Sequence, residues 1–346
     1  MSDDLRSYLG EQADRLFADH CTRELREAAE AGEFPTALWD VLEQAGFAAV
    51  LVPEDEGGSG AGWPEAEVLL RAAGRHAAPV PLAETLLAGW LLGRNRIAVP
   101  PGPITIAPTR PGAGLSLVDG RLSGTAERVP WGRAAGNVLV AVGNQVALLE
   151  TTQAEVEPDT NMAGEPRDTL RFADAAPLAV ATDDALTTTS LWQLGALIRA
   201  GQIAGALQAS LAMAVQYAND RVQFGRPIGK FQAVQQSLAE LAGEVAAASA
   251  AVGAACERAA LPDAGFEIAV AKQRASEAAG IACRTAHQTH GAIGFTHEYA
   301  LHPLTRRLWS WRAEFGNDAH WAAELGRFAC GRGADALWPF LTDRTA

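Results

Sequence analysis

Four side chains between Arg221 and Gln232 could together bind an anionic, planar ligand. The stretch reads RVQFGRPIGKFQ and offers the guanidinium of Arg221, the amides of Gln223 and Gln232, and the aromatic ring of Phe224. An arginine fork beside amide groups and a flat ring suits a phosphate next to a heterocycle. The alternative is an ordinary helix hairpin with a solvated arginine, and this stretch alone leaves both interpretations open.

Two amphipathic helices must position this stretch. The helix before it carries apolar residues four apart, namely Ile203, Leu207, Leu211 and Val215, and the helix after it carries Val234, Leu238, Leu241 and Val245. Each set lies on one face of a 3.6-residue helix. Gly225, Pro227 and Gly229 interrupt that period. The pattern therefore predicts a short, rigid loop held between two packed helices.

The composition of the chain narrows the classes of function. Its 346 residues are 48% hydrophobic and 20% charged, with a net charge of −13, which argues against nucleic acid and anionic membrane as partners. The acidic N-terminus is not typical of a signal peptide, and no stretch approaches roughly 18 uncharged apolar residues, so we expect no membrane span. The scattered cysteines (Cys21, Cys256, Cys283, Cys330) predict reduced, buried thiols in a cytoplasmic protein, with no disulfide frame and no zinc site.

The order of patterns predicts an α+β fold that is mostly α. Residues 1–95 read as a helical domain, 96–184 as a small β-barrel or sandwich, and 185–346 as a helical bundle. Asp119-Gly120 and Gly143-Asn144 mark two tight β-hairpins. In the last part we expect helices near 190–219, 232–260, 264–289, 298–312 and 318–332. The glycine run after Pro53 lacks the Lys-Ser/Thr of a phosphate loop, so it is interpreted as a turn over a cleft rim.

Three motifs in this order resemble the acyl-CoA dehydrogenase family. They are AGFAAVLVPEDEGGSG near the N-terminus, RVQFGRPIGKFQAVQ in the helix-pair loop, and QTHGAIGFTHEYALHPLTRR at 288–307. The similarity covers nearly the whole chain. It implies an N-terminal helical domain, a middle β-barrel and a C-terminal four-helix bundle.

The resemblance also implies an FAD cofactor whose adenosine-diphosphate arm reaches a neighbouring subunit. By position, the residues implied to hold that arm are Arg221, Gln223, Phe224, Phe231 and Gln232 in the loop, and Gln288, His290, Gly291 and Ala292 in the second segment. Glycine lets a backbone approach a pyrophosphate closely, and Arg221 brings a positive charge to an acidic chain. The ring of His290 is interpreted as a packing or hydrogen-bonding group. His297 and His302 receive no role.

The implied reaction is the α,β-dehydrogenation of an acyl-CoA thioester. A carboxylate removes the α-proton, and the β-hydrogen leaves as hydride to the flavin. The implied partners are the acyl-CoA substrate, a homologous subunit or a second copy of the chain in a dimer or tetramer, and an electron-transfer flavoprotein or similar acceptor.

The chain departs from the family pattern where the base should be. Of the two family positions for that base, the commoner aligns with Phe315 and the alternative with Gly195. Glu314 is one residue away, a rotation of roughly 100° on a helix, and is the remaining candidate. In the β domain, residues 104–114 (ITIAPTRPGAG) replace a Thr-Glu-rich strand that ends in Gly-Ser-Asp in the family.

These departures suggest that the chain is one half of a heteromeric acyl-CoA dehydrogenase. A homologous partner would supply the base, and this chain would complete the flavin site at their interface. Relatives of this compact type resemble paired subunits that desaturate bulky thioesters such as steroid side chains. The alternatives are a self-sufficient homo-oligomer that uses an unusual base such as Glu314, and a non-catalytic stabilising subunit. The apolar ALWPFL at 336–341 fits either docking to another subunit or covering its own bundle.

Overall fold

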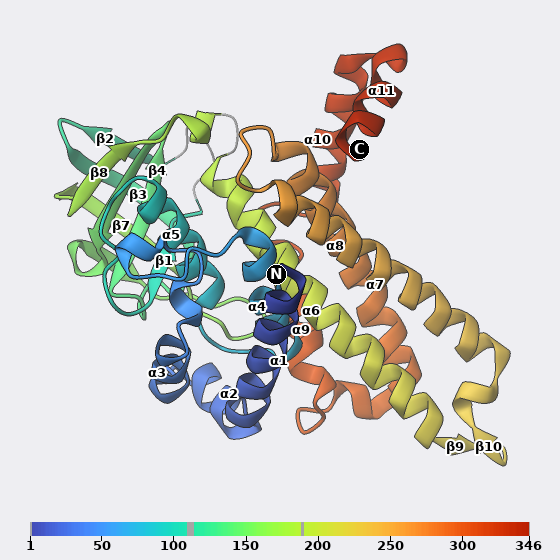
Figure 1. Cartoon of the computed structure of the whole chain (residues 1–346). Helices are drawn as coiled ribbons and strands as arrows, with labels where there is room; N and C mark the ends of the chain where they lie inside the picture. The colour runs from blue at the N-terminus through green and yellow to red at the C-terminus, as the bar shows by residue number, and fades with distance from the viewer. Residues whose placement is uncertain (1, 109–113, 188–189, 346) are drawn as a thin grey trace.

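Helices form both ends of the chain, and strands form its middle (Figure 1). The computed structural model describes residues 2–108, 114–187 and 190–345. The first five helices are α1 (Ser2–His20), α2 (Arg23–Glu30), α3 (Thr36–Gln44), α4 (Trp63–Arg75) and α5 (Leu82–Arg94). The later ones are α6 (Leu191–Asp220), α7 (Gln232–Arg258), α8 (Gly265–His290), α9 (Leu301–Trp311), α10 (Asp318–Arg332) and α11 (Ala334–Thr345). The predicted class, mostly helical with a small β region, is confirmed.

The middle region consists of two four-stranded sheets. One has the order β1-β4-β5-β8, and its strands are β1 (Ile104–Ile106), β4 (Asn137–Val142), β5 (Gln145–Glu150) and β8 (Ala179–Thr182). The other has the order β2-β3-β7-β6, with β2 (Leu115–Val118), β3 (Arg121–Pro130), β6 (Ala154–Glu157) and β7 (Arg167–Ala175). Among the strands in the described residues, β1 and β4 pair in parallel and the other pairs are antiparallel. Both predicted hairpins are present, as β2–β3 and β4–β5.

Apolar side chains from both sheets share one core. Val138 and Leu149 of the first sheet cluster with Leu122, Leu170 and Phe172 of the second. The other face of the first sheet joins the larger core, in which its Ile104, Ile106 and Leu139 cluster with residues of α5. The β region is thus covered by helices on one side, and this contact fixes its position relative to the bundle.

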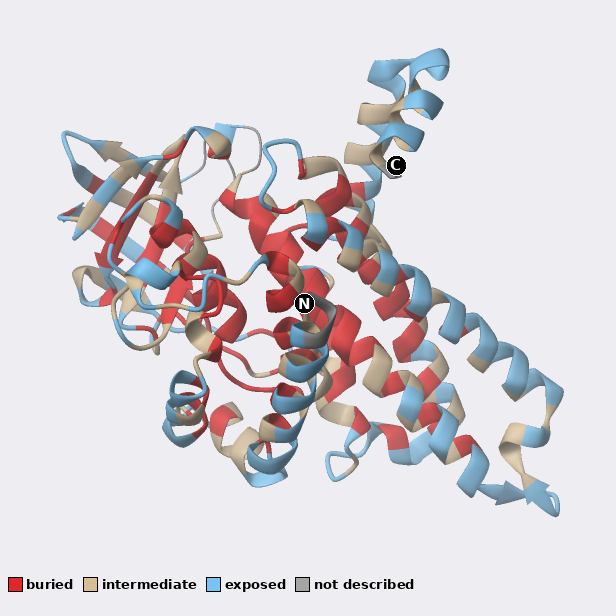
Figure 2. Cartoon of the chain, in the orientation of Figure 1, coloured by how far each residue is buried: buried red, intermediate tan, exposed pale blue. Residues whose placement is uncertain are grey.

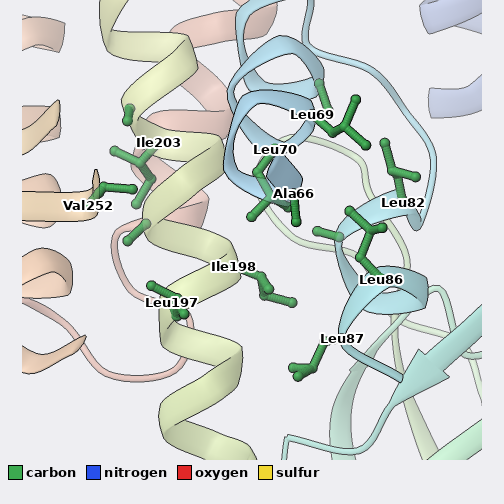
Figure 3. Packing of buried hydrophobic residues seen from close by; sticks show 14 of the residues in the cluster. Ala66, Leu69, Leu70, Leu82, Leu86, Leu87, Leu197, Ile198, Ile203 and Val252 are labelled. Atoms are coloured by element: carbon green, nitrogen blue, oxygen red, sulfur yellow. The ribbon is translucent and has the colours of Figure 1, made fainter. Parts of the chain in front are cut away.

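Helix α6 is the central helix of the molecule and packs against α4, α5, α7, α8 and α9. Its first half, from Leu191 to Leu207, is buried almost throughout. Ile198 points toward Leu86 and Leu87 of α5, whereas Ile203 lies beside Val252 of α7 (Figure 3). Two glycines allow α4 and α6 to cross closely. A Cβ on Gly74 would lie 1.9 Å from the carbonyl oxygen of Gln202, and one on Gly205 would lie 1.9 Å from that of Arg71. Any larger residue there would force the two helices apart.

The second half of α6 is more exposed and runs to a tight hairpin at the far end of the bundle, away from the sheets (Figures 1 and 2). Strands β9 (Val222–Gln223) and β10 (Arg226–Pro227) pair across Phe224 and Gly225, and Ile228–Lys230 form a 3₁₀ turn before α7. The predicted short loop between two helices is therefore present, and its rigidity stays a prediction. From Gly195 to Arg221, α6 spans about 39 Å at 1.5 Å per residue.

Helix α7 differs from the expectation that no stretch could span a membrane. In the described part of the chain, it is the one helix that has the length and composition of a membrane span. One such helix is weak evidence, because helices of soluble bundles pass the same test. Here α7 contributes Leu241, Val245 and Val252 to the large core shared with α6 and α8.

Two smaller expectations were wrong. The sequence pattern gave no helix after 332, but α11 follows α10 and contains Pro339. Cys330 is exposed, whereas the other cysteines are buried.

Candidate functional site

A cavity of about 610 Å³ lies at the hairpin end of the bundle. We call it the hairpin cavity. It is lined by Gln223, Phe224, Ile228, Phe231, Ala233, Val234 and Ser237 from the hairpin and α7, and by Arg284, Thr285, Gln288 and Thr289 from α8. Two stretches about 60 residues apart in the sequence thus meet at one cavity. Aromatic rings, amides, hydroxyls and one guanidinium face the same space.

Phe224 is held in an unusual conformation at the cavity rim. Its φ is +53° and that of Gly225 is +80°, which is the pattern of a tight hairpin turn that usually takes Asn-Gly. A left-handed conformation costs a phenylalanine about 1–2 kcal/mol. The ring is nevertheless 92% exposed. Neither backbone preference nor core packing explains a phenylalanine here, so the position is a candidate for contact with a ligand.

A second ring and a guanidinium support this rim. Phe231 meets Phe224 edge-to-face with ring centroids 6.1 Å apart, and the Arg226 guanidinium lies 4.3 Å from the centroid of Phe231. Such contacts fix flat surfaces without closing the cavity. The aromatic rim is therefore organised before any ligand binds.

The hairpin cavity is positively charged in an acidic protein. No Asp or Glu lines it, and in the described part of the chain no carboxylate forms an ion pair with Arg284 or Arg221. Arg284 was not among the residues singled out from the sequence. Its position four residues before Gln288 on α8, which places both on one helix face, was the available signal.

The other predicted residues do not line the hairpin cavity. Arg221 ends α6, and its carbonyl oxygen accepts a hydrogen bond from Ile228, which closes the hairpin. Gln232 is the first residue of α7. Gly291 ends α8 with φ +65°, and Ala292 follows in an exposed turn.

His290 is a buried packing group in this structure. Its ring lies 4.5 Å from that of Tyr217 and 5.1 Å from that of Tyr299, and its Nδ1 is 2.8 Å from the carbonyl oxygen of Ala286. Burial lowers the pKa of the imidazole. The contact with Tyr217 ties the second motif to the end of α6, and so holds the two predicted segments together.

A second cavity, of about 550 Å³, lies between the β region and the turn that joins α9 to α10. We call it the interdomain cavity. It is lined by Pro108, Gly114, Thr125, Glu127, Arg128, Pro130, Trp192, Ala313, Glu314, Phe315 and Gly316. Residues 109–113, which belong to the stretch expected to replace the family's Thr-Glu strand, lie outside the described residues.

The two positions that the resemblance implies for a base, Phe315 and Gly195, touch one another at this cavity. A Cβ on Gly195 would lie 2.2 Å from the Phe315 ring, so the ring occupies the space above Gly195. Phe315 has a φ of +52°, and Gly316 has a φ of +89°. The alignment thus brings two distant positions together, as expected if they are alternative sites for one base. Neither carries a group that can accept a proton.

Glu314, the remaining candidate, points into an arginine cluster. Its Oε1 accepts hydrogen bonds from Arg167 Nε (2.9 Å) and Asn161 Nδ2 (3.0 Å), and its Oε2 lies 2.8 Å from Arg199 Nε. Burial alone would raise the pKa of this carboxyl, but the charges of Arg167 and Arg199 outweigh burial and lower the pKa to about 2. A carboxylate held this way is a weak proton acceptor.

Glu314 is part of a buried charge network that joins all three regions of the chain. We define the buried charge network as Glu84, Glu165, Glu314, Arg167, Arg199 and Arg307. Arg199 on α6 also pairs with Glu84 on α5 at 2.7 Å, and Arg167 on β7 pairs with Glu165 at 2.9 Å. Three carboxylates balance three guanidiniums in this network, and Glu314 is its member that lines the interdomain cavity.

Lys272 holds the turn that carries Phe315. Its buried ammonium donates hydrogen bonds to the carbonyl oxygens of Arg312 (3.0 Å) and Gly316 (2.7 Å) and to the Ser276 hydroxyl (3.0 Å). Burial lowers the pKa of this amine to about 7. The turn is therefore fixed by an amine bound to neutral acceptors.

Two family models match this chain, and both describe domains of the same family. Residues 5–95 match the family model "Acyl-CoA dehydrogenase, N-terminal domain" and residues 188–327 match "Acyl-CoA dehydrogenase, C-terminal domain". The chain is 33% identical over 312 residues to the acyl-CoA dehydrogenase IpdE2 of Mycolicibacterium smegmatis, covering 87% of this chain and 91% of the relative. It is 29% identical to FadE28 of Mycobacterium tuberculosis, covering 83% of this chain and 91% of that protein.

Two solved structures share the whole fold. One is the ChsE4-ChsE5 complex from Mycobacterium tuberculosis, with a TM-score of 0.87 and 25% identity, covering 95% of this chain and 98% of that chain. The other is a variant of the Tcur3481-Tcur3483 steroid ACAD, with a TM-score of 0.86 and 26% identity, covering 96% and 99%.

Proposed function

The chain belongs to the acyl-CoA dehydrogenase family, and from this premise we propose that it is one subunit of a hetero-oligomeric, FAD-dependent enzyme that dehydrogenates an acyl-CoA thioester. In this proposal a homologous partner supplies the catalytic base. This chain contributes the hairpin cavity, which holds the distal arm of the flavin. The observation that carries the proposal is the Phe315 ring packed over Gly195, where a carboxylate would be needed.

The residues of the hairpin cavity fit the distal arm of FAD. A diphosphate needs cations and hydrogen-bond donors, which Arg284, Gln223 and Gln288 provide. An adenine needs a flat apolar surface, which Phe224 and Phe231 provide. The cavity contains no carboxylate to repel the phosphates.

The location of the hairpin supports a shared site. It lies at the opposite end of the bundle from the β region of the same chain (Figure 1). The roughly 39 Å of α6 between Gly195 and Arg221 exceed the reach of an extended flavin dinucleotide. A flavin arm in the hairpin cavity would therefore come from a cofactor whose ring is held by another chain.

The chemistry divides between the subunits. FAD, when bound, accepts the β-hydrogen of the substrate as hydride. The hairpin of this chain orients the cofactor, while Phe315 excludes water and offers no proton acceptor in its own interdomain cavity. The proton must then be taken by a carboxylate of the partner. Two solved neighbours, the ChsE4-ChsE5 complex and the Tcur3481-Tcur3483 enzyme, support a partner of the same family.

The test is to purify the chain alone and together with a homologue encoded beside it. We expect no reduction of an artificial electron acceptor by acyl-CoA with the chain alone, and turnover with the pair. Acyl-CoAs that carry short linear or bulky polycyclic groups, assayed side by side, would define the substrate. Turnover by the isolated chain with stoichiometric flavin would overturn the paired arrangement.

An Arg284→Gln variant separates this function from a purely stabilising role, because Arg284 is the arginine that lines the hairpin cavity. A subunit that holds the flavin arm should lose cofactor when this cation is removed, while the pair still assembles. A subunit that only stabilises its partner would keep both the flavin and the activity. Assembly and flavin content are read from the same size-exclusion peak.

A further inference from the structure

A third cavity, of about 670 Å³, lies beside α11 and is not used by the function proposed above. We call it the α11 cavity. Its walls come from the starts of α6 and α8, from α10 and from α11. The family match ends at residue 327, so α11 is a wall outside that match. Part of the α11 cavity is therefore formed by a segment that lies beyond the family match.

Two clusters of aromatic rings line the α11 cavity. Phe266, Phe328 and Phe340 contact one another with ring centroids 4.8 to 5.2 Å apart. Trp192, Trp321 and His320 form the second cluster, with centroids 5.1 to 5.3 Å apart. Aromatic residues on more than one wall of a cavity favour a flat, apolar ligand over a flexible chain.

Helix α11 is fixed in place as a wall. Arg344 donates to Asp263 and Glu267 at the start of α8, at 2.8 Å in each case, and its guanidinium lies 4.8 Å from the Phe340 ring centroid. Phe340 in turn packs between the two other rings of its cluster. The apolar 336–341 segment thus covers its own bundle through Phe340, while Trp338 is 71% exposed.

Arg332 gives the α11 cavity one unbalanced positive charge. Its guanidinium lies 3.8 Å from the Phe340 centroid and 4.4 Å from that of Phe328, and no carboxylate among the described residues pairs with it. The two carboxylates of the lining, Asp263 and Glu324, are already paired with Arg344 and Arg327. One free cation beside two carboxylates suits a single negative charge and disfavours a polyphosphate.

We propose that the α11 cavity binds a flat, polycyclic apolar molecule that carries one carboxylate. The rings would lie against the two aromatic clusters, and the carboxylate would pair with Arg332. This site is separate from the hairpin cavity that holds the flavin arm in the proposed function. It does not depend on a partner subunit or on flavin.

Binding can be measured on the full chain with 1-pyrenebutyrate, which has four fused rings and one carboxylate. Trp192 and Trp321 line the cavity and can transfer excitation to a bound pyrene. We expect saturable binding of one molecule per chain, and weaker binding of the uncharged analogue 1-pyrenebutanol. Arg332→Gln should weaken pyrenebutyrate by roughly 10-fold and leave pyrenebutanol unchanged.

Two further variants keep the test specific. Arg15→Gln removes an exposed arginine that does not line the cavity, so it should have no effect. Leu325→Trp fills the cavity from α10 and should abolish binding of both pyrenes. Equal binding to the Arg332→Gln variant, no saturable binding, or displacement of the pyrene by 3′,5′-ADP would overturn the proposal, the last by showing a nucleotide site instead.

Discussion

Glu314 and Phe315 are adjacent in sequence but face different surroundings. Glu314 turns toward Arg167 and Arg199, whereas Phe315 turns toward Gly195. Neither residue is helical, because both lie in the turn between α9 and α10, and Phe315 has a left-handed backbone with a φ of +52°. The conformation of this turn therefore directs the Glu314 carboxylate into the ion pairs and the Phe315 ring toward Gly195.

Replacing Glu314 with Gln should lower the free energy of unfolding of the chain, while turnover by the folded complex should be retained. The variant leaves two buried arginines without their shared carboxylate, which costs about 3–5 kcal/mol. Urea unfolding of the chain measures this loss. Glu157→Gln, which breaks an exposed pair with Arg171, is the matched control and should cost less than about 1 kcal/mol. Loss of turnover in a fully folded Glu314→Gln complex would instead make Glu314 the base.

The lowered pKa of Lys272 predicts that the free energy of unfolding depends on pH. The pKa of this amine is about 7 in the fold and 10.5 for an ordinary lysine. Between these values the unfolded chain binds more protons than the folded chain, so the free energy of unfolding should rise with pH, by up to about 1.4 kcal/mol per unit. Below pH 7 this contribution should be constant.

Denaturant unfolding at a series of pH values between 6 and about 10 tests this slope. Lys272→Met should flatten it, because the titrating amine is gone. Lys230→Met is the matched control, since Lys230 is the other lysine of the chain and is exposed. An unchanged slope in Lys272→Met would contradict the assignment.

At the scale of elements, the hairpin between α6 and α7 exposes the aromatic ring of Phe224. Its two helices were predictable from apolar spacing, because α6 and α7 begin and end within about two residues of the expected ranges. The exposure of Phe224 and the strain at its backbone were not visible in the sequence. They depend on how α6 and α7 meet, which is a property of the packed bundle.

Phe224→Asn tests whether flavin binding depends on the aromatic ring of Phe224 or on the conformation of the turn. Asparagine suits the left-handed turn position better than phenylalanine, so the melting temperature of the chain should stay equal or rise. The flavin content of the complex should fall at least about 10-fold, because the stacking surface is lost. Flavin retained at the wild-type level would show that the ring does not contact the cofactor.

Other features were beyond prediction for a physical reason. The ion pairs between Arg167 and Glu314 and between Arg199 and Glu84 join residues more than 100 positions apart, and nothing in local spacing identifies such partners. Helix α11 was missed because Pro339 interrupts its pattern. Arg284 was not predicted because it lies four residues before the second motif, which begins at Gln288. In each case tertiary packing determines the role of the residue.

At the scale of the whole molecule, charge is distributed unevenly. The net charge is −13, yet the hairpin end gathers Arg221, Arg226, Lys230 and Arg284 without an ion-paired carboxylate among the described residues. Most other arginines pair with Asp or Glu. An acidic protein that leaves cations unpaired at one place provides a local site for an anion.

Arg284→Gln should therefore weaken flavin binding by the complex about 10-fold at low salt and by less at high salt, since screening already reduces the contribution of the charge. Flavin fluorescence during dilution of the complex measures the affinity. Arg274→Gln is the control, because Arg274 lies on the same helix but pairs with Glu244 and Glu277. Equal loss in both variants would indicate a general effect of charge.

The central claim is that this chain completes a flavin site whose base and ring contacts belong to a homologous partner. Native mass spectrometry of the co-purified complex, with the flavin counted per chain, tests it most directly. The account predicts equal numbers of both chains, one flavin for each pair, and no flavin on this chain when it is purified alone. A homo-oligomer of this chain with one flavin per chain would contradict it.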